Sequence, residues 1–95
     1  MTTNESTVKK IIKRDGNIVD FDLDRITTAI FKAASSVGGK DRDTAAALAR
    51  EVEQALVHTY DSKAYPSVEE IQDLVEATLI KRGHVKPSRA YIIYR

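Results

Sequence analysis

One tight turn constrains the fold of this chain more than any other feature. Asp15-Gly16-Asn17 separates two segments rich in β-branched residues, 8–14 and 18–21, and such a turn between such segments is typical of a β-hairpin. Two strands of this length are not stable alone, and they need an apolar surface to pack on. Because the rest of the chain carries helical patterns, we expect the hairpin to pack on helices.

The next two segments have the apolar spacing and the end signals of amphipathic helices. In the first, apolar residues recur at i, i+3, i+4 and i+7, and alanines raise the helix propensity of the second. The first helix is expected to be capped by Asp22 or Asp24 and to end at Gly38-Gly39. The second is expected to begin near Asp41 or Asp43 and to end near the segment from His58 to Asp61. The expected buried faces are Ile26, Ala29, Ile30 and Ala33, and then Leu48, Val52, Leu56 and Tyr60.

A third helix follows an extended link at Ala64-Tyr65-Pro66. Ser67 and Glu70 have the spacing of a capping box, and Lys81-Arg82-Gly83 is a typical helix end. Pro87 suits the start of a fourth helix. The expected face of the third helix is Ile71, Leu74, Val75, Thr78 and Leu79. The fourth helix carries Ala90, Tyr91, Ile93 and Tyr94, and we expect its tyrosines at the edge of the core.

The size of the chain fits one domain with one modest core, at 95 residues, 42% hydrophobic and 31% charged. We predict an α+β fold, mainly α, with an N-terminal β-hairpin lid over a small four-helix bundle. Residues 8–95 form the domain and residues 1–7 a disordered tail. Because the fourth helical pattern still runs at Arg95, we expect a longer protein, cut at a domain edge.

Composition argues against several classes of protein. A formal net charge of +1 does not suit a protein that holds nucleic acid by bulk charge. The absence of cysteine excludes disulfides and thiolate metal sites, and no run approaches the roughly 18 apolar residues of a membrane helix. Nucleophiles and bases are scattered, so we predict no catalysis in this chain. We expect a cytoplasmic location.

The hairpin carries a cluster of cations that leads into a helix start. Arg25 lies on the first turn of that helix, and free N–H groups with partial positive charge at a helix start suit phosphate groups. The β-branched strand residues could flank a flat base. From the residues alone, both a nucleotide site and a solvated basic hairpin stay open. The strand cations are Lys9, Lys10, Lys13 and Arg14.

A family resemblance is carried by the stretch IIKRDGNIVDFDLDRITTAI, which resembles the opening of the ATP-cone. This is the regulatory nucleotide-binding domain at the N-terminus of many ribonucleotide reductases. The stretches SVEEIQDLVEATLIKRG and SRAYIIYR resemble its third helix and its closing Ala-Tyr-x-x-Tyr-Arg signature, so the resemblance covers Val8 to Arg95. The opening motif reads Lys13-Arg14-Asp15-Gly16, four residues, Phe21-Asp22, two residues, Arg25-Ile26, then Ala29-Ile30, with arginine at position 25 where lysine is more usual.

The resemblance implies an allosteric switch that binds ATP or dATP with magnesium and does no chemistry itself. It also implies a reductase catalytic domain beyond Arg95, and oligomer or docking contacts through helix faces outside the site. The resemblance also implies that dATP inhibits the reductase and that ATP relieves this inhibition. The residues assigned by family position are Lys13, Arg14 and Arg25 for the phosphates, Asp22 and the backbone around Val19 for adenine, and Ser67 and Gln72 near the triphosphate; no protein side chain is assigned to a metal.

Two alternatives belong to other classes. A transcriptional repressor of reductase genes also contains an ATP-cone, but that family carries a cysteine-rich zinc ribbon ahead of the cone, and this chain has no cysteine. The other alternative is a helical protein-interaction module without a ligand.

Overall fold

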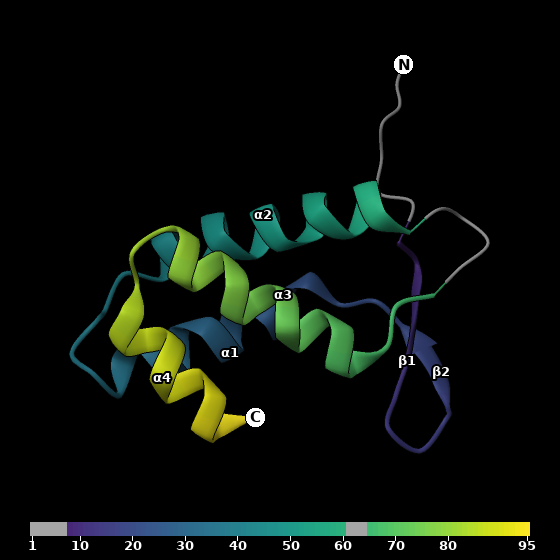
Figure 1. Cartoon of the computed structure of the whole chain (residues 1–95), viewed down its shortest axis with the longest axis horizontal. Helices are drawn as coiled ribbons and strands as arrows, with labels where there is room; N and C mark the ends of the chain where they lie inside the picture. Colours follow the sequence, from purple (N-terminus) through teal and green to yellow (C-terminus); the bar gives the residue numbers. More distant parts are fainter. Residues whose placement is uncertain (1–7, 61–64) are drawn as a thin grey trace.

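The fold joins a small hairpin to a helical bundle. A computed structural model describes residues 8–60 and 65–95; the predicted tail, residues 1–7, lies outside the described residues, as do residues 61–64. The predicted fold class is confirmed, because a two-stranded antiparallel sheet precedes four helices in the described part of the chain (Figure 1). The elements are β1 (Lys10–Ile12), β2 (Ile18–Asp20), α1 (Leu23–Ser35), α2 (Arg42–Thr59), α3 (Val68–Lys81) and α4 (Val85–Tyr94).

The four helices enclose a single apolar core. α1 packs on α2 and α4, and α3 packs on the same two helices. The predicted apolar faces of the first three helices are confirmed at their central positions, since Ile30, Val52 and Val75 are each at most 1% exposed. Among the described helices, none is long and apolar enough to cross a membrane.

The apolar residues of the fourth helix are not all buried. Tyr91 is buried at 4% exposure, but Ile93 is 87% exposed and Tyr94 is 55% exposed. Two residues along an α-helix turn the side chain by about 200°, so Tyr91 and Ile93 cannot both face one core. Ser88, one turn before Tyr91, is buried instead. The apolar residues near the end of α4 therefore cover two different faces.

The structure decides which residue caps each helix. Asp22 caps α1 by accepting a hydrogen bond from the Asp24 amide at 3.0 Å, and Asp41 caps α2 by accepting from the amides of Asp43 and Thr44. In each predicted pair the first aspartate is the cap. Hydrogen bonds from Thr44 stabilise the carboxylate of Asp41 and lower its pKa below the usual value. The predicted capping box of α3, Ser67 with Glu70, is also confirmed.

The hairpin stands at the end of the bundle where α3 begins (Figure 1). The amide of Ile12 donates to the carbonyl of Pro66 at 3.0 Å, so β1 is joined to the segment that leads into α3. Gly16 takes the turn with a φ of 89°, a value that glycine adopts without strain. β2 is exposed along its whole length, and its Ile18 is 56% exposed. The hairpin therefore leaves apolar surface open beside the bundle.

Candidate functional site

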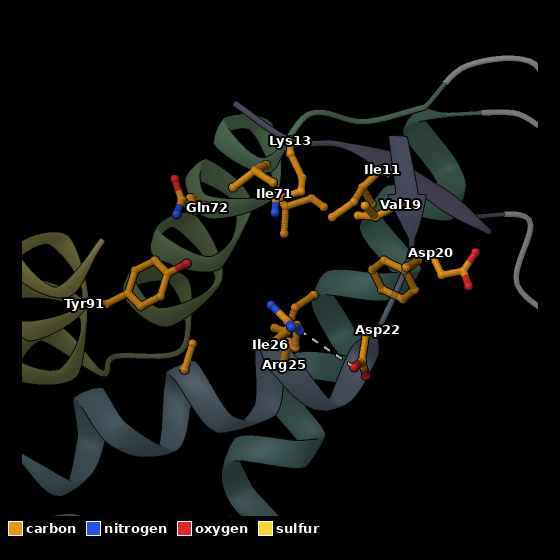
Figure 2. Close-up of a pocket in the computed structure, with 13 residues that line it drawn as sticks. Ile11, Lys13, Val19, Asp20, Asp22, Arg25, Ile26, Ile71, Gln72 and Tyr91 are labelled. Carbon is orange, nitrogen blue, oxygen red and sulfur yellow. Dashed lines mark ion pairs between the residues drawn. The ribbon is translucent and has the colours of Figure 1, made fainter. Parts of the chain in front are cut away.

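A cavity of about 440 Å³ lies between the hairpin, the first turns of α1 and α3, and α4 (Figure 2). Its position follows from two junctions in the chain. The join between β1 and the segment before α3 fixes one wall, and the passage of β2 through Asp22 into α1 fixes the other. The hairpin and α1, from the N-terminal part of the chain, therefore face one space together with α3 and α4 from its C-terminal part.

Five of the seven predicted site residues line this cavity. They come from the hairpin, from the start of α1 and from α3, and they include the two cations on which the predicted phosphate site depends. Arg14 and Ser67 are not among the lining residues. The five that the fold brings together are Lys13, Val19, Asp22, Arg25 and Gln72.

The two lining cations are available to a ligand. Lys13 is exposed and has no acidic partner among the described residues. Arg25 is 89% exposed at its side chain, and its only ion pair in the described chain joins its Nε to Oδ2 of Asp22 at 3.9 Å. Exposed contacts at this distance contribute little, so Arg25 can turn toward an anion at low cost.

The two lining carboxylates are already engaged elsewhere. Asp20 is paired across the strands with Lys10, whose hydrogen bond and charge lower the pKa of Asp20, and Figure 2 shows its carboxylate directed away from the cavity. Asp22 accepts the capping hydrogen bond of α1. With the Asp20 carboxylate directed away, the charged groups at the cavity are the cations Lys13 and Arg25 and the carboxylate of Asp22.

Apolar side chains make up much of the remaining wall. Ile11, Val19 and Phe21 line it from the hairpin, and Ile71 lines it from α3. Val19 stays 37% exposed although it is β-branched and apolar. A wall of this kind can cover the flat face of a nucleobase, while the cations hold an anionic group attached to it.

Arg14 does not line the cavity, but it is hydrogen-bonded to Gln72, which does. Its Nη2 donates to Oε1 of Gln72 at 3.1 Å, and its Nε lies 3.6 Å from Oε2 of Glu69. Because the side-chain oxygen of Gln72 is occupied by Arg14, the side-chain NH₂ group remains as a donor for a ligand. In this arrangement Arg14 links the hairpin to α3 and orients Gln72; its predicted contact with phosphate stays a prediction.

Ser67 acts in the structure as the N-cap of α3. Its hydroxyl accepts from the Glu70 amide at 3.1 Å, and the Glu70 carboxylate accepts from the Ser67 amide at 2.9 Å. The Ser67 contacts thus satisfy the helix end, and its predicted approach to a triphosphate stays a prediction.

Ser67→Ala should lower the free energy of unfolding by about 1 kcal/mol, because an N-terminal amide of α3 loses its acceptor. Thermal unfolding followed by circular dichroism would measure the loss. Ser36→Ala is a useful control, since that hydroxyl also bonds the backbone, at 2.7 Å to the Ala33 carbonyl, but at a helix C-terminus. Equal stabilities of wild type and Ser67→Ala would contradict the capping role.

Sequence reasoning missed Tyr91 as a cavity residue and treated it as a residue of the core edge. The structure places it on α4, buried at 4% exposure, among the residues that line the cavity. One signal was available, because a tyrosine on the inner face of a helix brings a hydroxyl that requires a polar environment. The contributions of Phe21 and Ile71 had no such signal, since both also fit the core pattern.

A metal ion would need the ligand to complete its coordination. Within residues 8–60 and 65–95 there is no group of three or more histidine, cysteine, aspartate or glutamate residues that could hold one. Mg²⁺ in nucleotide sites is commonly held by phosphate oxygens and waters with one or two carboxylates. The residues of the cavity are compatible with a cation that arrives bound to a triphosphate.

Comparison with known proteins gives a consistent result. Residues 9–95 match the family described as the ATP cone domain. A vitamin B12-dependent ribonucleoside-diphosphate reductase of Mycobacterium tuberculosis is 41% identical over 86 residues, which cover 90% of this chain and 12% of the relative. The corresponding enzyme of Thermoplasma acidophilum is 39% identical over 93 residues, 93% of this chain and 12% of the relative.

The similarity extends to a second kind of reductase. An anaerobic ribonucleoside-triphosphate reductase of Haemophilus influenzae is 34% identical over 85 residues, covering 90% of this chain and 12% of the relative. The chain thus spans about 12% of the length of each of these curated relatives.

Proposed function

Because the chain belongs to the family of ATP cone domains, which are nucleotide-binding regulatory domains, we propose that its cavity binds ATP or dATP as an allosteric effector. The effector would carry Mg²⁺ on its phosphates. The activity under control would be that of a ribonucleotide reductase, the kind of enzyme named in the relatives. The cytoplasmic location stays a prediction.

One observation supports this proposal most directly. Lys13 and Arg25 come from the hairpin and from α1, yet they line the same cavity, and Lys13 has no acidic partner among the described residues. Two cations that face one cavity repel each other, and an anion bound between them relieves that repulsion. A triphosphate would supply that anion, with charge-assisted hydrogen bonds to both side chains.

The two ends of the cavity suit the two ends of a nucleotide. At the hairpin end, Val19 and Phe21 offer apolar surface, and Asp22 offers an oxygen that can accept from the amino group of adenine. Toward α3 and α4, Gln72 offers donors beside the two cations. In this pose the phosphates lie away from the carboxylates of Asp20 and Asp22.

Discrimination between ATP and dATP depends on a single hydroxyl group. One neutral hydrogen bond is worth about 0.5–1.5 kcal/mol, which corresponds to roughly 2- to 13-fold in affinity. Opposite effects of the two nucleotides therefore require that each favours a different arrangement of the protein. The output would be a changed oligomeric or docking state, formed by helix faces outside the cavity.

Isothermal titration calorimetry of the 95-residue chain tests the proposal. ATP and dATP with Mg²⁺ should each give saturable heat, and each should bind more tightly than inorganic tripolyphosphate, because only the nucleotides use the apolar wall. The tripolyphosphate titration is the control for binding by charge alone. An absence of saturable heat with either nucleotide at millimolar concentration would favour an interaction module without a ligand.

A further inference from the structure

Tyr91 is a buried residue whose hydroxyl has no hydrogen-bond partner among residues 8–60 and 65–95. Tyr91 is 4% exposed, and Figure 2 shows its hydroxyl directed from α4 into the cavity. No hydrogen bond to this hydroxyl is made by the residues that the structure describes. Buried polar groups are nearly always hydrogen-bonded, because a group that loses its hydrogen bonds to water and gains no others costs free energy. This hydroxyl is therefore available to a group that enters the cavity, either water or a ligand.

The surroundings of Tyr91 indicate which kind of group could accept a hydrogen bond from its hydroxyl. Gln72 stands beside it on the neighbouring α3, with its side-chain oxygen occupied by Arg14, and Lys13 and Arg25 lie across the cavity (Figure 2). Lys13 and Arg25 are cations and cannot accept the Tyr91 proton, and no hydrogen bond joins Gln72 to Tyr91 in the described chain. The Glu76 carboxylate, whose charge also acts on Tyr91, is paired with Arg95. The lining carboxylates are held at the hairpin and at the N-cap of α1.

The protonation state of Tyr91 allows its hydroxyl to act as a hydrogen-bond donor. Burial raises the pKa of Tyr91 to about 12, so the phenol keeps its proton at every physiological pH. A protonated phenol among cations and amide donors matches a ligand group that only accepts hydrogen bonds and carries negative charge. A phosphoryl group has both properties, whereas a nucleobase presents donors as well as acceptors.

We propose that Tyr91 is a further binding residue of this site, whose hydroxyl donates a hydrogen bond to a phosphoryl oxygen of the effector. This inference rests on the proposed nucleotide function. It gives α4 a direct contact with the ligand, in addition to the contacts from the hairpin, α1 and α3. It also gives the phosphate end of the site a neutral donor beside the cations.

Tyr91→Phe tests the proposal, because it removes the hydroxyl and keeps the ring. ATP with Mg²⁺ should bind the variant roughly 10- to 160-fold more weakly, the range for loss of one hydrogen bond to a charged group. Adenosine, which carries no phosphate, should give the same response with both proteins when followed by NMR at millimolar concentration. The thermal midpoint of the ligand-free variant should be equal to or above that of wild type, since no protein hydrogen bond is lost.

The matched control is Tyr94→Phe. Tyr94 lies on the same helix with its ring centroid 6.3 Å from that of Tyr91, but it is 55% exposed and does not line the cavity. Removal of the Tyr94 hydroxyl should leave the affinity for ATP unchanged. The thermal midpoint separates a binding role from a structural one, because a structural hydroxyl would lower it on removal.

The possible results separate this inference from the proposed function. If wild type binds ATP and Tyr91→Phe binds it within about twofold of wild type, the Tyr91 contact is overturned while the nucleotide function stands. An equal loss for adenosine and ATP overturns the assignment to phosphate. If wild type itself gives no saturable binding, the proposed function fails and this inference fails with it.

Discussion

Leu79→Ala is expected to lower the free energy of unfolding by about 2–5 kcal/mol. Leu79 is 1% exposed in the middle of the helical core, so its replacement removes apolar contacts and leaves a cavity that the neighbouring helices can fill only in part. A domain of this size is stable by about 5–15 kcal/mol, so the loss is a large share of the total. Urea unfolding with an unchanged m-value would measure it.

Ile80→Ala is the matched control for this prediction. Ile80 is the next residue of α3 and has the same number of side-chain carbons, but it is 57% exposed. Its replacement should change the free energy of unfolding by less than about 0.5 kcal/mol, as is usual for surface positions. Similar losses for the two variants would contradict the assignment of Leu79 to the core and Ile80 to the surface.

Lys13→Ala is expected to weaken the binding of ATP with Mg²⁺ by about 1.5–3 kcal/mol, or roughly 10- to 160-fold. Lys13 lines the cavity and has no acidic partner among the described residues, so its loss removes a charge-assisted contact without releasing a buried carboxylate. For the same reason, the stability of the ligand-free domain should change little. Calorimetry would measure the affinity, and thermal unfolding the stability.

Lys9→Ala distinguishes a direct contact from the general effect of charge. Lys9 is an exposed lysine of the same segment, and it does not line the cavity. Its replacement lowers the net charge by the same amount and, at 0.15 M salt, should change the affinity by less than about threefold because exposed charges are screened. An equal effect of the two substitutions would remove Lys13 from the site.

The sequence was most informative where structure depends on near neighbours. The Asp15-Gly16-Asn17 turn predicted the hairpin, and the capping box of Ser67 and Glu70 predicted the start of α3. Both are set by residues within a few positions of one another. Local pattern was less reliable at the end of α4, where the orientation of Ile93 depends on which face the other helices cover.

The candidate site could be predicted only in part for a similar reason. The resemblance to a known family named Lys13, Arg25 and Gln72, and the fold brings these residues to one cavity. It also named Arg14 as a phosphate ligand, which stays a prediction; it did not predict the bond of Arg14 to Gln72, 58 positions away in the chain. No pattern of neighbouring residues predicts a contact over such a separation.

The sequence by itself determined the order of the elements, the capping box of α3 and most of the buried faces of the first three helices. Turn geometry, helix caps and apolar spacing depend on residues within about one or two helical turns of each other, so they can be predicted from residues that are close in sequence. Only the tertiary structure decided that the hairpin stands at the start of α3, and that Tyr91 of the last helix faces Lys13 of the first strand segment across one cavity. Those relations come from the packing of four helices around a shared core, where each position depends on all the others.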